Sequence, residues 1–232
     1  EVGAVRVAID GLEMDFVTDC RLFSPGAPDR GTLAMLQAAR IRPGQKVLDL
    51  GCGWGLAGVY AGLVCGEANV VMLDIDPLAV EVAARNAARN GVAGVRALVS
   101  DGLAALDETG FDVILCNPPY HADFSVVRRS IKKSFNRLAM GGEMWMVTKR
   151  RAWYQNKFAA IFGGVRVHPL QHRPRVVGGA RVEPSPPDLE DPAGCVAVEH
   201  EHPPIAERQP ERASERRCLD EELELEEGLV RE

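Results

Sequence analysis

The hydrophobic pattern along the chain changes from one period to another. Residues 5–20 alternate between apolar and polar around Asp10-Gly11, which predicts a β-hairpin. Beyond a loop at 23–32, short runs that are apolar throughout alternate with longer segments of helical period. The apolar runs predict strands at 46–50, 69–73, 95–99, 111–116, 143–147 and 165–168. The helical segments predict a helix capped by Thr32 and further helices at 56–64, 77–89, 126–138 and 153–162, with Gly141-Gly142 stopping the fourth. This order indicates a doubly wound α/β fold with a mostly parallel sheet.

The pattern changes after His168. Nine of the 15 prolines lie at or beyond Pro169, and no Phe, Trp or Tyr follows Phe162. From Pro184 onward the chain is polar, rich in proline and finally rich in glutamate, a composition typical of disorder. We therefore expect an N-terminal β-hairpin extension at 1–22, an α/β domain at 23–170 and a disordered tail at 171–232.

Charge separates the same two parts of the chain. The formal net charge is −6. Residues 1–168 carry 19 Lys and Arg against 17 Asp and Glu, a net of +2, and the remaining 8 and 16 give the tail a net of −8. The acidity of the tail therefore does not exclude a polyanionic substrate for the α/β domain.

Cysteine usage and the absence of targeting signals suggest a compartment. The six cysteines form no Cys-x-x-Cys pair and show no zinc-ligand spacing with the five histidines, so we expect free thiols and no metal. No apolar run is long enough for a membrane span, and no basic, apolar leader is visible. We expect a cytoplasmic protein without membrane contact. Because the chain begins with Glu1 rather than Met, we also expect an upstream piece.

A glycine-rich turn follows the strand at 46–50. It reads Asp49-Leu50-Gly51-Cys52-Gly53-Trp54-Gly55 and precedes a predicted helix. Glycines let a backbone approach a ligand closely, and the free N–H groups of a helix N-terminus attract a carboxylate or a phosphate. The spacing differs from the dinucleotide fingerprint, because Leu56 stands where that motif has a glycine. We expect a nucleoside cofactor here rather than a plain strand-to-helix turn.

Two acidic positions follow the next two strands. Asp74 ends the second strand of the predicted sheet, where a carboxylate can accept hydrogen bonds from both hydroxyls of a ribose. Asp101-Gly102 follows the third strand, where Asp101 can accept from an adenine amine. Alone, an Asp-Gly pair indicates only a turn. The prediction therefore depends on its position at the same edge of the sheet as the glycine-rich turn and Asp74.

The sequence Asn117-Pro118-Pro119-Tyr120 follows the fourth strand. The nitrogen of an exocyclic purine amine or a carboxamide has its lone pair delocalised, and two acceptors on its hydrogens free that lone pair for attack. The Asn117 side-chain oxygen and the Pro118 carbonyl can be these acceptors. The two prolines fix the loop and remove competing donors, and Tyr120 can stack on a flipped-out base. We expect these four residues to be catalytic rather than a simple proline turn.

Together these residues resemble the class I S-adenosylmethionine-dependent methyltransferase superfamily over about residues 20–168. The resemblance implies a Rossmann-like methyltransferase fold with a seven-stranded type of sheet, and S-adenosylmethionine as cofactor. The cofactor residues that it implies are Asp49, Gly51, Gly53, Gly55, Asp74, Asp101 and Gly102. The loop at 23–32, the stretch 141–147 and the helix at 153–162 are similar to the methyltransferase small domain family. That family contains bacterial enzymes that methylate guanine N2 in small-subunit ribosomal RNA.

The end of the α/β domain departs from that family. Its members normally finish with an aromatic-rich strand that pairs back into the sheet. Here Pro169-Leu170-Gln171-His172-Arg173-Pro174 leads into the polar tail, which leaves open whether the last strand is missing and whether a reading-frame change produced this C-terminus.

Basic residues favour RNA as the partner. Lys149-Arg150-Arg151 follow the fifth strand at its carboxyl end, the edge where open α/β sheets bind ligands, and we expect them to bind substrate. Further basic residues lie on the helix at 126–138, where RNA contact and a solvated helix face are equally good readings. The leading prediction is a guanine-N2 methyltransferase acting on small-subunit ribosomal RNA. Alternatives are a glutamine-N5 protein methyltransferase, an adenine-N6 nucleic-acid methyltransferase and an inactive binding module.

Overall fold

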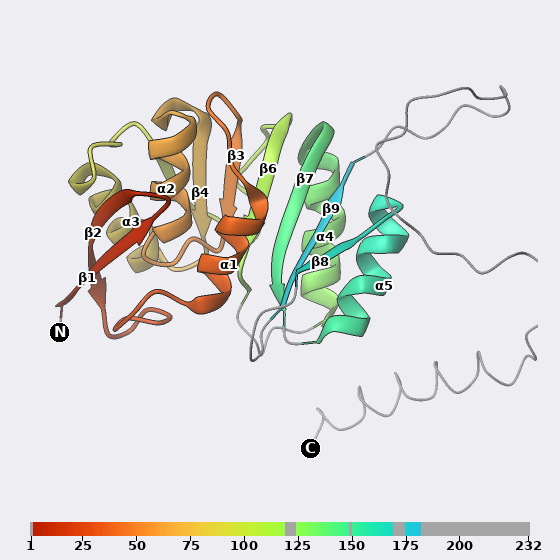
Figure 1. Ribbon diagram of the computed structural model, residues 1–232, viewed down its shortest axis with the longest axis horizontal. Coiled ribbons are helices and arrows are strands. Elements are labelled where there is room, and N and C mark those ends of the chain that lie inside the picture. Colours follow the sequence, from red (N-terminus) through yellow and green to blue (C-terminus); the bar gives the residue numbers. More distant parts are fainter. Residues whose placement is uncertain (1, 119–123, 149, 169–174, 182–232) are drawn as a thin grey trace, which may run out of the picture. The chain divides into compact units, whose positions relative to one another are not determined.

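The computed structural model describes residues 2–118, 124–148, 150–168 and 175–181, all within one compact unit, Glu1–Ser185. Its centre is a seven-stranded sheet with the order β5-β4-β3-β6-β7-β9-β8 (Figure 1). The five strands β5, β4, β3, β6 and β7 are parallel to one another, and β9 lies antiparallel between β7 and β8. The sheet strands are β3 Val47–Leu50, β4 Val70–Asp74, β5 Arg96–Val99, β6 Phe111–Cys116, β7 Leu138–Thr148, β8 Arg166–His168 and β9 Arg175–Ala180. The predicted doubly wound fold is confirmed.

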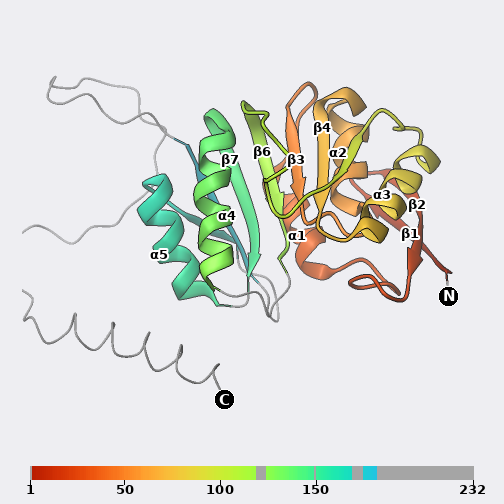
Figure 2. The same cartoon turned by 180° about the vertical axis from the view of Figure 1, so that it is seen from behind.

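Helices cover both faces of the sheet because its strands are apolar on both sides. The α-helices are α1 Arg30–Ala39, α2 Leu56–Cys65, α3 Pro77–Arg89, α4 Phe124–Arg137 and α5 Arg151–Phe162, and a short 3-10 helix, η1, spans Glu67–Asn69. Val47 and Met72 point into a core shared with α1, α2 and α3. Leu48 and Leu73, their neighbours in sequence, point into a second core with α4 and α5. Figure 2, the view from behind, shows α4 in front of β7. None of the described helices combines the length and the apolar character that crossing a membrane requires.

The last strand of the sheet is present, so the expectation that it could be missing is wrong. β9 lies within the range assigned to the tail and pairs with β7 from Thr148↔Arg175 to Glu143↔Ala180. Val177 is fully buried, and a Cβ added to Gly178 would come within 2.7 Å of the Trp145 ring. Two glycines of β9 lie against aromatic rings from other elements, Gly178 against Trp145 of β7 and Gly179 against Phe158 and Phe162 of the helix at Arg151–Phe162.

Two boundaries also differ from the sequence expectation. Asp29, not Thr32, caps α1: its side chain accepts from the Thr32 N–H, and Asp29 itself is extended. Gly141 and Gly142 do not separate a helix from a strand but lie inside β7, near a register shift against β6. A Cβ on Gly142 would come within 2.6 Å of the Phe111 carbonyl oxygen, so the close approach of the two strands requires glycine there.

The N-terminal hairpin is observed as β1 Val2–Ile9 and β2 Leu12–Asp19, and it packs on α3. Asn86 of α3 accepts from Val17 N and donates to Val17 O, both at 2.8 Å. One turn later, Asn90 makes the same pair of bonds with the Asp15 backbone. The two carboxamides therefore satisfy the edge of β2 as a neighbouring strand would.

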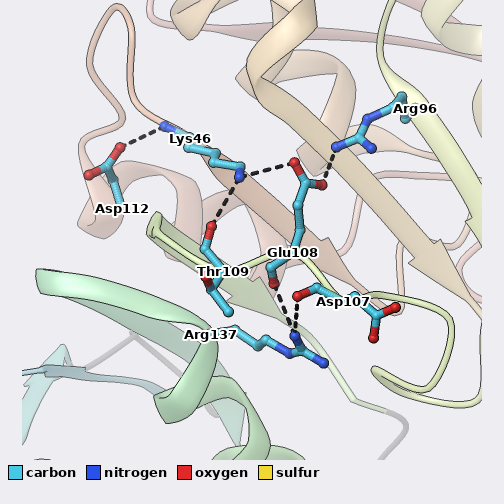
Figure 3. Close-up of polar contacts among 7 residues, drawn as sticks. All are labelled: Lys46, Arg96, Asp107, Glu108, Thr109, Asp112 and Arg137. Atoms are coloured by element: carbon cyan, nitrogen blue, oxygen red, sulfur yellow. Dashed lines mark hydrogen bonds and ion pairs between the residues drawn. The ribbon is translucent and has the colours of Figure 1, made fainter.

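A polar network lies at the amino ends of the central strands β3 and β6 (Figure 3). The Lys46 N–H donates to Asp112 Oδ2 at 2.7 Å, and Lys46 Nζ lies 3.1 Å from Glu108 Oε1. Glu108 also pairs with Arg96, and these neighbours hold the pKa of its carboxyl below its ordinary value. The loop that contains Glu108 is thereby tied to the sheet at the edge away from the strands' carboxyl ends.

Candidate active site

A cavity of about 410 Å³ lies at the carboxyl ends of the parallel strands. Its wall includes the loops that follow β3, β4, β5 and β6, part of the segment 21–35, and residues of α4 and β7. β3 lies between β4 and β6, so the chain winds outward in opposite directions on its two sides. Such a topological switch point is where open α/β sheets bind ligands, and the volume is that of a small-molecule site.

The glycine-rich turn forms one wall of the cavity. Gly53 has φ +54°, and among the described residues, apart from Gly53 and its two chain neighbours, no atom lies within 4 Å of the position where its Cβ would be. Its N–H donates to Asp74 Oδ2 at 2.8 Å. Gly51 also lines the cavity. An open, side-chain-free backbone of this kind is suited to a ligand that approaches the main chain closely.

Gly55 has a structural role in the turn. It is the N-cap residue of α2, with φ +92°, and it does not belong to the cavity wall. A Cβ there would lie 3.0 Å from Cα and Cβ of Ala83 in α3. The turn and the close packing of α2 and α3 therefore favour glycine at this position, and its contact with a cofactor stays a prediction.

Asp49 lies behind the turn and is almost completely buried. Burial is the largest influence on this carboxyl and raises its pKa to about 7. The hydrogen bond from the Gly58 N–H to Oδ2 acts in the opposite direction. The charge of Asp74 raises the pKa further. A carboxyl with this pKa is partly protonated near neutrality and responds to a cation placed beside it.

The two acidic positions expected at the cofactor both lie in the cavity wall. Asp74 accepts one backbone N–H on each oxygen, from Gly53 at 2.8 Å and from Asp76 at 3.0 Å. Because each carboxylate oxygen has two lone pairs, Asp74 retains capacity for further donors. Asp101 is exposed, and Gly102 beside it has φ +57°.

Asn117 is held by hydrogen bonds to two residues at the start of α1. Its Nδ2 donates to Asp29 Oδ1 at 2.8 Å and to Thr32 Oγ1 at 2.9 Å. Its Oδ1 is shielded from water and accepts no hydrogen bond from the residues that the structure describes. A buried acceptor without a donor costs free energy, so the oxygen is available to a donor that a ligand provides.

The remaining predicted residues are only partly described. Pro118 lines the cavity beside Asn117. Pro119, Tyr120 and Lys149 lie outside the described residues, and of Arg151 only its place at the start of α5 is described. Arg150 is exposed, precedes α5, and donates its backbone N–H to Thr148 Oγ1 at 3.0 Å.

Asp29, Thr32 and Ile75 are among the residues of the cavity wall that the sequence analysis did not assign to the site. Asp29 and Thr32 line the cavity and bind Asn117, whereas the sequence indicated only a helix cap at Thr32. Ile75 lines the cavity with 66% of its surface exposed, an unusual position for a large apolar residue. An apolar residue directly after Asp74 is the only local signal that pointed to it, and such a residue is suited to a flat ring.

Comparisons with known proteins agree with this geometry. The family model described as methyltransferase small domain matches residues 13–176. A relative from Pseudomonas putida, "Ribosomal RNA large subunit methyltransferase G", is 34% identical over 164 residues, which is 68% of this chain and 44% of that protein. "Ribosomal RNA small subunit methyltransferase C" from Hahella chejuensis is 36% identical over 150 residues, or 63% of this chain and 43% of that protein.

A solved structure extends the comparison to three dimensions. It is the T. thermophilus 16S rRNA N2 G1207 methyltransferase RsmC in complex with AdoMet and guanosine. Its TM-score is 0.70 at 26% identity, covering 78% of this chain and 50% of that one. The chain thus spans about half the length of these relatives. The match of the family model, which includes the glycine-rich turn and Asn117, shows that the chain belongs to the methyltransferase small domain family.

Proposed function

We propose that this chain is an S-adenosylmethionine-dependent N-methyltransferase domain that methylates the exocyclic N2 amine of a guanine in small-subunit ribosomal RNA. The observation that carries the proposal is the buried Oδ1 of Asn117, an acceptor without a donor at the wall of a cavity that a glycine-rich turn also lines. The ribosomal RNA methyltransferases among the relatives, and the guanosine bound in the RsmC structure, support the choice of substrate.

The described residues fit S-adenosylmethionine. When bound, this cofactor supplies an electrophilic methyl group on a sulfonium. Gly51 and Gly53 leave open space for it at the backbone, and Asp74 has lone pairs for the ribose hydroxyls. Ile75 and Asp101 would flank the adenine, and Asp49 would meet the positive charge of the cofactor behind the turn.

The target nitrogen would be activated at Asn117 and Pro118. An amine conjugated to a purine is a poor nucleophile because its lone pair is delocalised into the ring. Oδ1 of Asn117 and the Pro118 carbonyl would each accept one of its hydrogens, which localises the lone pair for attack on the methyl carbon. The amine loses one proton to solvent after the nitrogen–carbon bond has formed, so no general base is required at this site.

Basic side chains would hold the RNA beside the cavity. Arg128 and Arg129 of α4 are exposed, and their neighbours Val127 and Ser130 line the cavity. Lys132 and Lys133 are exposed one turn further along, and no Asp or Glu occurs between 124 and 137. With Lys149, Arg150 and Arg151, these cations would bind phosphates, which provides affinity without sequence choice.

The proposal is tested in parallel reactions that all contain the purified protein and methyl-deuterated S-adenosylmethionine. Each reaction receives one substrate: small-subunit RNA, large-subunit RNA or assembled subunits. Nucleosides are then analysed by mass spectrometry. We expect deuterated N2-methylguanosine from the small-subunit samples, and Asn117→Ala should reduce its rate of formation by roughly 10²–10³ with little change in cofactor affinity.

Other products would contradict the proposal in distinct ways. Label in N2-methylguanosine of the large-subunit RNA would refute the choice of subunit. Label in N6-methyladenosine or in glutamine of a ribosomal protein would refute the choice of nucleophile. An Asn117→Ala variant that methylates at the wild-type rate would refute the role of this residue.

A further inference from the structure

The carboxamide of Asn117 has a fixed orientation, and its environment explains why. An amide side chain has nearly the same shape after a half-turn, so its hydrogen-bond partners decide which end is oxygen. A carboxylate is acceptor-only, and Asp29 Oδ1 lies 2.8 Å from one end of the Asn117 amide. That end must be the nitrogen, because the reversed orientation would place two oxygens in contact.

We propose that Asp29 and Thr32 are positioning residues whose task is to hold Asn117 with its oxygen presented to the target amine. Thr32 Oγ1 accepts the second hydrogen of the Asn117 nitrogen at 2.9 Å. With both hydrogens engaged, the amide cannot rotate without losing two bonds. The catalytic consequence rests on the proposed function, whereas the orientation itself does not.

Helix capping alone does not account for this arrangement. Asp29 caps α1 by accepting from the Thr32 N–H at 2.9 Å, and serine would serve that purpose equally well. The same oxygen, Asp29 Oδ1, also accepts from Asn117 Nδ2 at 2.8 Å, and only a carboxylate brings a negative charge to that contact. The Thr32 hydroxyl contributes no backbone cap, yet it contacts Asn117, 85 residues away in the sequence. Helix capping therefore explains the bond from the Thr32 N–H to Asp29, but neither of the two bonds that Asn117 donates.

The charge of Asp29 also strengthens the acceptor. A hydrogen bond from an amide N–H to a carboxylate draws the amide toward its polar resonance form and increases the negative charge on the oxygen. Asn117 Oδ1 is then a better acceptor for a positive charge that develops on the target nitrogen. Because the amide is oriented before the target arrives, little reorganisation opposes the reaction.

Three substitutions separate positioning from capping. Thr32→Val keeps the shape of the side chain and removes the hydroxyl, and Thr32→Ser keeps the hydroxyl as its matched control. Asp29→Ser keeps a capping oxygen and removes the carboxylate charge from the contact with Asn117. We expect about 3- to 10-fold slower single-turnover methylation for Thr32→Val and about 10- to 100-fold for Asp29→Ser, with Thr32→Ser recovering most of the rate. Cofactor affinity should change little in all three.

A double-mutant cycle tests whether these residues act through Asn117. In an Asn117→Ala background, Thr32→Val and Asp29→Ser should each reduce the rate by less than about twofold, because the group that they position is absent. Losses that multiply fully with that of Asn117→Ala would overturn the proposal. So would a Thr32→Ser variant as slow as Thr32→Val.

A spectroscopic measurement tests the orientation without any substrate. The side-chain amide signals of Asn117 are assigned by their disappearance in Asn117→Ala, and slow hydrogen exchange is expected for a shielded, doubly bonded NH₂ group. Thr32→Val and Asp29→Ser should shift these signals and accelerate their exchange, and Thr32→Ser should not. Insensitivity to both substitutions overturns the inference. If the amide behaves as expected but the wild-type protein methylates no RNA, the proposed function fails and the positioning stands.

Discussion

At the scale of single residues, Asp49 shows how the fold changes the chemistry of a side chain. Its carboxyl is buried behind the glycine-rich turn, and burial raises its pKa to about 7, well above the ordinary value for an aspartate. The native state therefore binds this proton more tightly than the unfolded chain does. The stability from this group is fully present below about pH 4 and is lost as the pH rises through 7.

This shift predicts a specific pH dependence. Between pH 4 and 7 the free energy of unfolding of the wild type should fall relative to that of Asp49→Asn, by at most about 1.4 kcal/mol per pH unit. Urea unfolding of both proteins without cofactor, at closely spaced pH values, measures the difference and cancels the other titrating groups. Parallel stability curves for the two proteins would show that Asp49 ionises normally in the native state.

At the scale of elements, α3 joins the hairpin to the glycine-rich turn. Asn86 is completely buried, and besides its two bonds to Val17 it donates to the Trp54 carbonyl at 2.7 Å. Phe16 of β2 packs edge-on against the Trp54 ring at 4.9 Å. The hairpin is therefore part of the packing that supports the turn, although it lies outside the sheet.

Removing this connection should destabilise the protein. Asn86→Ala leaves buried backbone groups of Val17 and Trp54 without partners, and we expect a loss of about 2–4 kcal/mol in the free energy of unfolding. Asn90→Ala is the matched control, since it removes the same pair of bonds to β2 at an exposed site and should cost less than about 1 kcal/mol. Equal losses in chemical denaturation would show that burial of Asn86 is not the source of its effect.

The exposed face of α4 provides a second prediction at this scale. Replacing Arg128, Arg129, Lys132 and Lys133 by Gln should weaken RNA binding and flatten its dependence on salt, because fewer counterions are released. Arg85→Gln with Arg89→Gln on α3, an exposed pair of cations far along that helix from the cavity, is the control. Filter binding across a salt series measures both. An unchanged salt slope in the α4 variant would indicate a solvated helix face.

At the scale of the whole molecule, β9 completes the sheet. Its Val177 is buried, and the strand lies between β7 and β8 and pairs with both. Its two glycines accept Trp145 on one side and the rings of Phe158 and Phe162 on the other. We therefore expect the chain beyond residue 170 to be required for the stability of the α/β domain.

Two truncations test this requirement. A chain that ends after residue 170 lacks β9 and should lose at least about 10 °C in melting temperature, because several kcal/mol of packing and strand pairing are removed. A chain that ends after residue 183 retains β9 and should melt close to the full chain, as the composition of the remaining segment predicts. A large fall for the longer truncation would show that residues 184–232 stabilise the domain.

The sequence by itself determined the features that depend on local signals. Apolar runs and turn residues predicted the strands β3 to β6 and the helices between them, because periodicity and glycine chemistry act within one element. The carboxyl ends of parallel strands share one edge, so the glycine-rich turn, Asp74, Asp101 and Asn117 could be predicted to meet. The family resemblance is confirmed by the match of the family model.

Only the tertiary structure decided the contacts between distant segments. β9 carries a weak strand signal and is fixed by its antiparallel pairing with β7 and by rings from other elements. Asp29 and Asn117 are 88 residues apart, and Asn86 and Val17 are 69 apart. Hydrogen bonds of this kind depend on where two elements come to rest after the core has packed, and no periodicity along the chain encodes that position.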